Sequence, residues 1–283
     1  MEEDLRLRAA YAACRRIHRR HDPTYYWATR RLPAHVRPAV HAVYGYVRGA
    51  DELVDGPGRA RTPRERRTAL DRWEAELAQG LAGAGSPHPV VAALVDAGRR
   101  HDLPLGELRG YMRSMRTDCD RVRLADREEL ERYMEGSTGT VGRIMAPLLG
   151  VPPERARAFG RLGTAFQLTN FIRDVREDYA RLDRIYLPGV SEAELAAGRA
   201  TASLRGRLAD EVARARARFA ETVPAVASAS PQARPGMRVA VAVYLRVLDR
   251  VERLGFDVLD RRASLGPLDV GRALAAAPGL AGG

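Results

Sequence analysis

The sequence predicts an all-α protein, a single-domain helix bundle over residues 1–283. Ala, Leu, Arg and Glu dominate the composition, and these residues favour helices. Apolar residues recur at helical spacing and do not alternate, which is typical of amphipathic helices rather than strands. No segment is long and polar enough to be an interdomain linker, so we expect one domain.

Clusters of Gly and Pro divide the chain and set the limits of the expected helices. These breaks fall at Pro33, Gly56-Pro57-Gly58, Ser86-Pro87, Pro104, Pro152-Pro153, Pro188-Gly189 and Pro235-Gly236. The stretches between them keep the helical spacing of apolar residues. In order, we expect helices over 3–20, 34–55, 63–81, 89–101, 105–117, 126–149, 153–181, 201–229 and 236–262, each boundary good to ~2–4 residues.

The charge of the chain favours anionic partners. All 47 Lys+Arg positions are Arg, against 36 acidic residues, which gives a formal charge of +11. Such a surface suits phosphates, nucleic acid or a membrane surface. The run RRIHRRH (15–21) leaves a non-catalytic polyanion-binding protein as an alternative. Nothing resembles a nucleic-acid module, so we expect no nucleic-acid partner, while peripheral membrane contact stays open.

The cysteines and the apolar segments indicate the cellular compartment in which we expect the protein. Cys14 and Cys119 are the two cysteines, and their separation predicts neither a disulfide framework nor a zinc site. The start, MEEDLRLR, is unlike a signal peptide. No apolar run approaches the ~20 residues that a membrane span needs. We therefore expect a cytoplasmic protein.

One predicted helix carries two carboxylates near its end, in YGYVRGADELVD (44–55). Tyr44, Arg48, Asp51 and Asp55 follow i, i+4, i+7, i+11 and share one face. Like charges at i, i+4 destabilise a helix slightly, so Asp51 and Asp55 need a reason. A solvated helix end is the simpler one. The sharper one is Mg²⁺, which takes one or two carboxylates and completes its shell with water and substrate phosphate.

A second acidic helix face lies in QLTNFIRDVRED (167–178). Gln167, Asn170, Asp174 and Asp178 follow i, i+3, i+7, i+11 beside an apolar stripe, with Arg173 next to that face. Two such helices facing each other could hold Mg²⁺ ions that stabilise a diphosphate as it leaves. The sequence therefore predicts an enzyme that ionises an allylic diphosphate in an apolar cavity.

Small residues interrupt a third helix, in YMEGSTGTVG (133–142). Each Gly inside a helix costs ~1 kcal/mol relative to Ala, so the glycines need a function. One interpretation is a bare helix wall that makes room for a prenyl chain. The alternative is close packing between helices, or a loop.

These motifs together resemble the squalene/phytoene synthase family, the head-to-head type of isoprenyl diphosphate synthase, over nearly the whole chain. TYYWATRRLP (24–33) resembles its substrate motif and RGADELVD (48–55) its first Asp-rich motif. The stretch 167–178 followed by RIYLP (184–188) resembles the second Asp-rich motif, and 243–263 the C-terminal helix. The resemblance implies an all-α isoprenoid synthase bundle with a central cavity.

The resemblance also assigns roles to single residues. It implies that Mg²⁺ and diphosphate are held by Asp51, Asp55, Asn170, Asp174 and Asp178. It implies phosphate contacts from Arg48, Arg173 and Arg262. The residues expected to line the site are Tyr44, Tyr133, Gln167 and Tyr244, with Thr24 in the substrate motif.

One departure from the family pattern concerns the second substrate, the acceptor of the prenyl group. Family members usually carry Lys or Arg just before the pair that matches Thr24-Tyr25, where this chain has Pro23 after Asp22. Head-to-head coupling needs two anion sites, and this change weakens one. We therefore favour an aromatic, carbazole-like acceptor in secondary metabolism, as in a minority branch of the family. Phytoene- or squalene-type coupling and terpene cyclisation are the alternatives.

Overall fold

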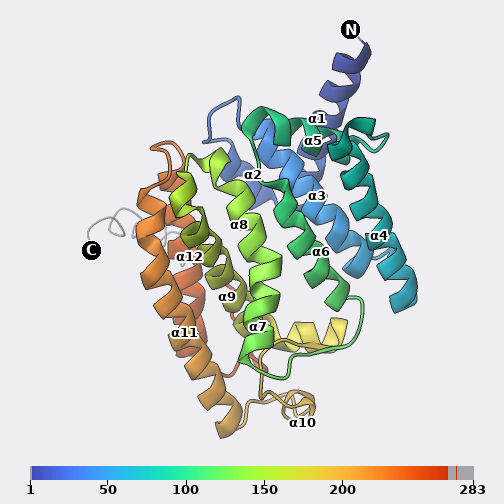
Figure 1. The fold of residues 1–283 in the computed structure, drawn as a ribbon. Coiled ribbons are helices and arrows are strands. Elements are labelled where there is room, and N and C mark those ends of the chain that lie inside the picture. Colours follow the sequence, from blue (N-terminus) through green and yellow to red (C-terminus); the bar gives the residue numbers. More distant parts are fainter. Residues whose placement is uncertain (1, 267–271, 273–283) are drawn as a thin grey trace.

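The computed structural model describes residues 2–266 and 272, and helices make up most of it (Figure 1). The first half contains α1 (Glu2–His21), α2 (Pro23–Thr29), α3 (Arg37–Asp55), α4 (Pro63–Gln79), α5 (Pro89–His101) and α6 (Leu108–Thr117). The second half contains α7 (Arg127–Met134), α8 (Thr140–Met145), α9 (Ala156–Leu182), α10 (Glu192–Ala196), α11 (Ala202–Ala227) and α12 (Arg234–Arg253). The all-α prediction is confirmed.

The expected helices are all found, but two of them were drawn too long. The stretch 126–149 is broken by the π-helical segment η3 (Glu135–Gly139), which joins α7 to α8. The helix expected over 236–262 ends at Arg253, because Gly255 and Phe256 both have φ of 60° and leave the helical region. The short helices α2 and α10 were not predicted.

The helices pack side by side, with α4 and α11 at opposite edges of the view in Figure 1. At one side α1, α3 and α5 pack against one another. At the other side α9 packs against η3, α8, α11 and α12. One buried apolar cluster runs through both sides and includes Tyr46, Met112, Leu168 and Phe219. Among the described residues, none of the helices is both long enough and apolar enough to cross a membrane.

A two-stranded parallel pair lies beneath the helices and positions a residue of the site. Strand β1 (Val122–Arg123) follows α6, and β2 (Arg184–Ile185) follows α9, with Val122 opposite Arg184. Asp183 ends α9 with φ of 55°, a left-handed conformation that Asp tolerates better than most residues. Its carbonyl oxygen accepts a hydrogen bond from Arg123 at 2.6 Å, which fixes the turn into β2.

Candidate active site

The carboxylate of Asp51 is held inside the protein by α6. Tyr111 donates its hydroxyl to Asp51 at 2.6 Å and also to the carbonyl oxygen of Val47 at 3.1 Å. Burial raises the pKa of Asp51 to about 6, although the Tyr111 hydrogen bond and the charge of Arg48 both lower it. Asp51 therefore faces the interior and is not part of a solvated helix end.

Asp55, one turn further along α3, is paired with a buried arginine. Arg184 donates both of its terminal nitrogens to the Asp55 carboxylate, one of them at 2.9 Å. Only 4% of Arg184 is exposed. A buried charge persists when it is paired, and the two-point geometry of guanidinium and carboxylate suits this pairing.

Arg184 also contacts a buried group that the sequence analysis did not single out. It donates to the carbonyl oxygen of Asp118 at 2.6 Å, and the Asp118 carboxylate lies 3.8 Å from its Nε. Tyr133 and Tyr186 donate their hydroxyls to the same carboxylate at 2.5 Å and 2.8 Å. Burial raises the pKa of Asp118 to about 6, while Arg184 and the two tyrosines lower it. Tyr133, predicted to line the site, is buried and donates to Asp118, and its role in the site stays a prediction.

The second acidic face, on α9, approaches the same arginine. Burial raises the pKa of Asp178 to about 7, the nearby charge of Asp174 raises it further, and Arg184 lowers it. Arg184 is therefore ion-paired with Asp55 of the first Asp-rich stretch, and its charge lowers the pKa of Asp178 in the second. That the two stretches together hold Mg²⁺ and a diphosphate stays a prediction.

Asp174 and Asn170 lie on the same face of α9, but only the Asp174 side-chain oxygens accept hydrogen bonds from described residues. Arg173 grips Asp174 with two hydrogen bonds of 2.7 and 2.5 Å. The side-chain oxygen of Asn170 is buried and has no hydrogen-bond partner within the described part of the chain. A buried acceptor without a donor is costly, so this oxygen is available to a cation.

The donor set fits Mg²⁺, although it does not form a single ion cage. Carboxylate and amide oxygens are the ligands that Mg²⁺ prefers, and the orphaned oxygen of Asn170 is of that kind. Within residues 2–266 and 272, no three His, Cys, Asp or Glu side chains converge on one metal position. This agrees with ions that each take one or two carboxylates and share the diphosphate.

Two of the arginines predicted to bind phosphate, Arg48 and Arg262, are each paired with a glutamate. Arg48 pairs with Glu52 one turn away on α3. Arg262 is exposed and pairs with Glu177 at 2.9 Å, on the rim of the site. The side chain of Thr24 lies outside the described residues.

The predicted lining residues lie on four helices, with Tyr133 on α7. Tyr44 of α3 stacks on His18, with ring centroids 4.1 Å apart. Gln167 of α9 is half-buried. Tyr244 of α12 packs on Phe166 at 4.5 Å, and its pKa is raised by burial while Arg173 and Asn170 lower it. Tyr244 therefore lies near Arg173 and Asn170 of α9.

The small-residue segment serves close packing. A Cβ on Gly136 would lie 2.3 Å from the Ser114 hydroxyl oxygen and 3.1 Å from the Gly110 carbonyl oxygen. A Cβ on Gly142 would lie 3.0 Å from the Cα of Gly160. At both glycines the space is filled by a neighbouring helix, so the packing interpretation describes them better than a bare wall for a prenyl chain. The π-helical turn there is a feature often found near functional sites.

The Asp22-Pro23 pair is explained by the start of α2. The Asp22 carboxylate accepts a hydrogen bond from the Tyr25 amide at 2.8 Å, which is the contact of a helix N-cap. Pro23 is the first residue of the helix, a position that proline favours. Asp22 and Pro23 therefore have a structural role at the start of α2. For that reason they are weaker evidence that an anion site has been lost.

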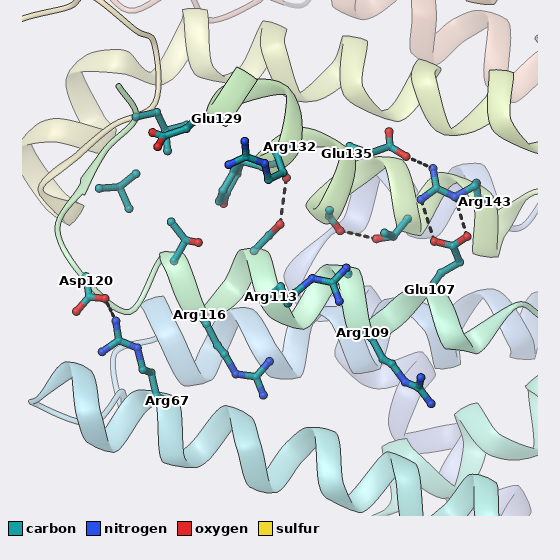
Figure 2. Close-up of a pocket in the computed structure, with 18 of the residues that line it drawn as sticks. Arg67, Glu107, Arg109, Arg113, Arg116, Asp120, Glu129, Arg132, Glu135 and Arg143 are labelled. Atoms are coloured by element: carbon teal, nitrogen blue, oxygen red, sulfur yellow. Dashed lines mark hydrogen bonds and ion pairs between the residues drawn. The ribbon is translucent and has the colours of Figure 1, made fainter. Parts of the chain in front are cut away.

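A wide hollow lies beside α6 (Figure 2). It is a groove of about 1270 Å³ between α6 and the α7–η3–α8 segment. The residues labelled in Figure 2 are mainly charged, with Arg67 and Asp120 at one end and Arg143, Glu107 and Glu135 at the other. We call it the outer groove. It contains none of the Asp-rich residues.

The all-helical bundle has the fold of the all-α isoprenoid synthases. The model of the squalene/phytoene synthase family matches residues 18–269. The chain therefore belongs to this family, whose members are prenyltransferases. This family membership also decides against a non-catalytic polyanion-binding protein.

Individual relatives agree with the family. The chain is 35% identical over 272 residues to phytoene synthase 3, chloroplastic, of Zea mays, covering 91% of this chain and 62% of that protein. It is 34% identical over 278 residues to phytoene synthase of Arthrospira platensis, covering 90% of this chain and 87% of that protein.

Solved structures share the fold. A dehydrosqualene synthase in complex with a ligand superposes with a TM-score of 0.85 at 24% identity, covering 98% of each chain. Squalene synthase HpnC from Alicyclobacillus acidocaldarius superposes with a TM-score of 0.80 at 29% identity, covering 89% of this chain and 96% of that chain.

The prediction of an aromatic, carbazole-like acceptor is wrong. The relatives that match most of the chain are named phytoene synthases. The prediction gave too much weight to Pro23, a single position with a local structural reason. Phytoene- or squalene-type coupling, stated as the alternative, has the better support.

Proposed function

We propose that this protein joins two prenyl diphosphates head to head, as a phytoene- or squalene-type synthase. The observation that carries the proposal is buried Arg184, which is ion-paired with Asp55 of the first Asp-rich stretch and whose charge lowers the pKa of Asp178 in the second. The names of the relatives favour C20 diphosphate as the substrate. The name of HpnC keeps C15 diphosphate as the second candidate.

The first diphosphate is proposed to bind at the face of α9. Asn170, Asp174 and Asp178, with Asp51 and Asp55 opposite, would hold Mg²⁺, which when bound neutralises the diphosphate and stabilises it as a leaving group. Arg173 now grips Asp174 and would turn to a phosphate oxygen when a cation takes the carboxylate. The apolar residues beside this face would exclude water from the carbocation.

The second diphosphate is proposed to bind where α1 meets α3. Arg48 and His21 both lie at Glu52, the His21 Nδ1 at 3.7 Å from its carboxylate. Arg48 offers a guanidinium group and His21 an imidazole near the position where other family members carry Lys or Arg. Pro23 therefore need not remove the second anion site.

The ionisation step is tested by release of inorganic diphosphate. We expect release from C20 or C15 prenyl diphosphate in Mg²⁺ and none in EDTA. Asp174→Asn keeps the shape of the side chain but removes its charge, so we expect turnover to fall by ~10²–10³-fold with the fold intact. Asp210→Asn, an exposed position on α11, is the matched control and should keep full activity. Full turnover in Asp174→Asn would refute the assignment.

A further inference from the structure

A second, smaller hollow adjoins the site. It has a volume of about 190 Å³, and Asp55, Asp118 and Arg184 form part of its wall. Arg59, Arg66 and Arg121 also line it. We call it the inner hollow. It is below the ~300–1,000 Å³ of pockets for organic ligands, and it has room for a small inorganic anion.

Two arginines of the inner hollow donate to backbone carbonyl oxygens and not to carboxylates. Arg66 donates only to carbonyl oxygens, those of Ala60, Arg61 and Cys119, at 2.9, 3.0 and 2.5 Å. Arg59 donates to the carbonyl oxygen of Asp55 at 3.1 Å. Neither forms an ion pair with any carboxylate of the described residues.

The carboxylates of the inner hollow all have partners other than Arg59 and Arg66. Asp55 pairs with Arg184, and Asp118 is held by Arg184 and two tyrosines. Asp120 pairs with Arg67. Asp183 pairs with Arg123 and lies 3.5 Å from Arg121. The four arginines and four aspartates of the lining balance in charge, and Arg59 and Arg66 are the two whose guanidinium groups are left without a carboxylate partner among the described residues.

Unsatisfied donors lie among the groups that form the inner hollow. The Nε atoms of Arg66 and Arg184 are buried, and no acceptor among the described residues receives a hydrogen bond from either. Arg184 is 4% exposed. Buried donors of this kind are costly unless an acceptor reaches them, and phosphate oxygens suit guanidinium groups best.

The inner hollow also leads outward. Asp120 and Arg121 line both the inner hollow and the outer groove. In the outer groove, Arg109 and Arg113 extend from α6, and neither has a hydrogen bond or ion pair within the part of the chain described (Figure 2). Arginine side chains therefore line both hollows: Arg184 and Arg121 the inner hollow, and Arg121, Arg113 and Arg109 the outer groove.

We propose that the inner hollow binds inorganic diphosphate without a metal ion, and that this diphosphate leaves through the outer groove. The proposal rests on the proposed function, because the reaction cleaves the bond between the prenyl carbon and diphosphate and releases that anion beside Asp55. Arg59 and Arg66 hold the anion in the inner hollow, with Arg184 at its inner end.

The test is titration calorimetry of the full chain with inorganic diphosphate in EDTA, so that the Mg²⁺ site does not contribute. We expect binding by the wild type, and ~10-fold weaker binding by Arg59→Gln and by Arg66→Gln, since each removes charge-assisted hydrogen bonds. Arg64→Gln is the matched control, an exposed arginine two residues from Arg66 that does not line the inner hollow, and it should bind as the wild type does.

Arg59 is exposed and makes one hydrogen bond, so Arg59→Gln stays informative if Arg66→Gln fails to fold. No binding in EDTA, equal affinity in Arg59→Gln and Arg64→Gln, or monophosphate bound as tightly as diphosphate would overturn the proposal. Asp174→Asn should keep metal-free binding while losing turnover. Failure of the proposed function would instead appear as intact diphosphate binding with no coupled product.

Discussion

At the scale of single residues, Arg184 connects the two halves of the site. Its partner Asp55 is 129 residues away in the sequence, and Asp118 is 66 residues away. The periodicity of a helix relates residues within a few turns, so it predicted the faces that carry Asp51, Asp55, Asp174 and Asp178. It contained no signal for an arginine in a short strand, although RIYLP was already part of the recognised motif.

Removing Arg184 should destabilise the protein strongly. Arg184→Met leaves Asp55 without its partner and the buried Asp118 without its cation, and breaking a buried pair in this way typically costs ~3–5 kcal/mol. Urea unfolding measures the loss. Arg181→Met, at an exposed position near the end of α9, is the control and should change the free energy of unfolding little. Equal stability of the two variants would contradict the role of Arg184.

The raised pKa values predict how stability depends on pH. Burial raises the pKa of Asp178 to about 7 and that of Asp51 to about 6, from an ordinary value of 3.8. The folded protein therefore retains protons that the unfolded chain releases, so the free energy of unfolding should fall as pH rises from about 4 to about 7. Urea unfolding in EDTA at several pH values measures this. Asp178→Asn should make the free energy of unfolding less dependent on pH, whereas Asp210→Asn should not. Parallel pH curves for the wild type and Asp178→Asn would contradict a raised pKa at Asp178.

At the scale of elements, the helices were predictable and their interruptions were not. Amphipathic periodicity is local, so most of the main helices were found within a few residues of their observed limits, except those expected over 126–149 and 236–262. The π-helical turn η3 depends on Gly136 lying against Ser114 of α6, which is a contact between distant segments. The glycines of this turn suggested a special role, but the sequence alone did not distinguish space for a ligand from close packing.

Adding one methyl group at Gly136 should therefore destabilise the protein. The Cβ of Gly136→Ala would meet the Ser114 hydroxyl and the Gly110 carbonyl oxygen, and overpacking of this kind costs ~1–3 kcal/mol. The control is Gly206→Ala on α11, where a Cβ would meet nothing within 4 Å and should stabilise the helix by ~1 kcal/mol. Thermal unfolding compares them. Adding Ser114→Ala to Gly136→Ala should restore part of the lost stability. If Gly136→Ala instead stabilised the protein, the close packing of Gly136 against α6 would be contradicted.

At the scale of the whole molecule, the family could be recognised from the sequence because its motifs are spread over nearly the whole chain. The acceptor could not be inferred from Pro23, because this residue is explained by its place at the start of α2. The inner hollow and the outer groove are formed by side chains from α3, α4, α6 and the strand pair, and no sequence pattern reports such an assembly.

Product analysis of the wild-type protein with Mg²⁺ and a single prenyl diphosphate tests head-to-head coupling most directly. No other acceptor is supplied, so any product with two prenyl units must come from joining two substrate molecules. Mass spectrometry should show a C40 hydrocarbon from C20 diphosphate, or a C30 hydrocarbon from C15 diphosphate, with its cyclopropyl diphosphate precursor. Release of diphosphate with only single-unit alcohols or cyclised single-unit terpenes would contradict head-to-head coupling.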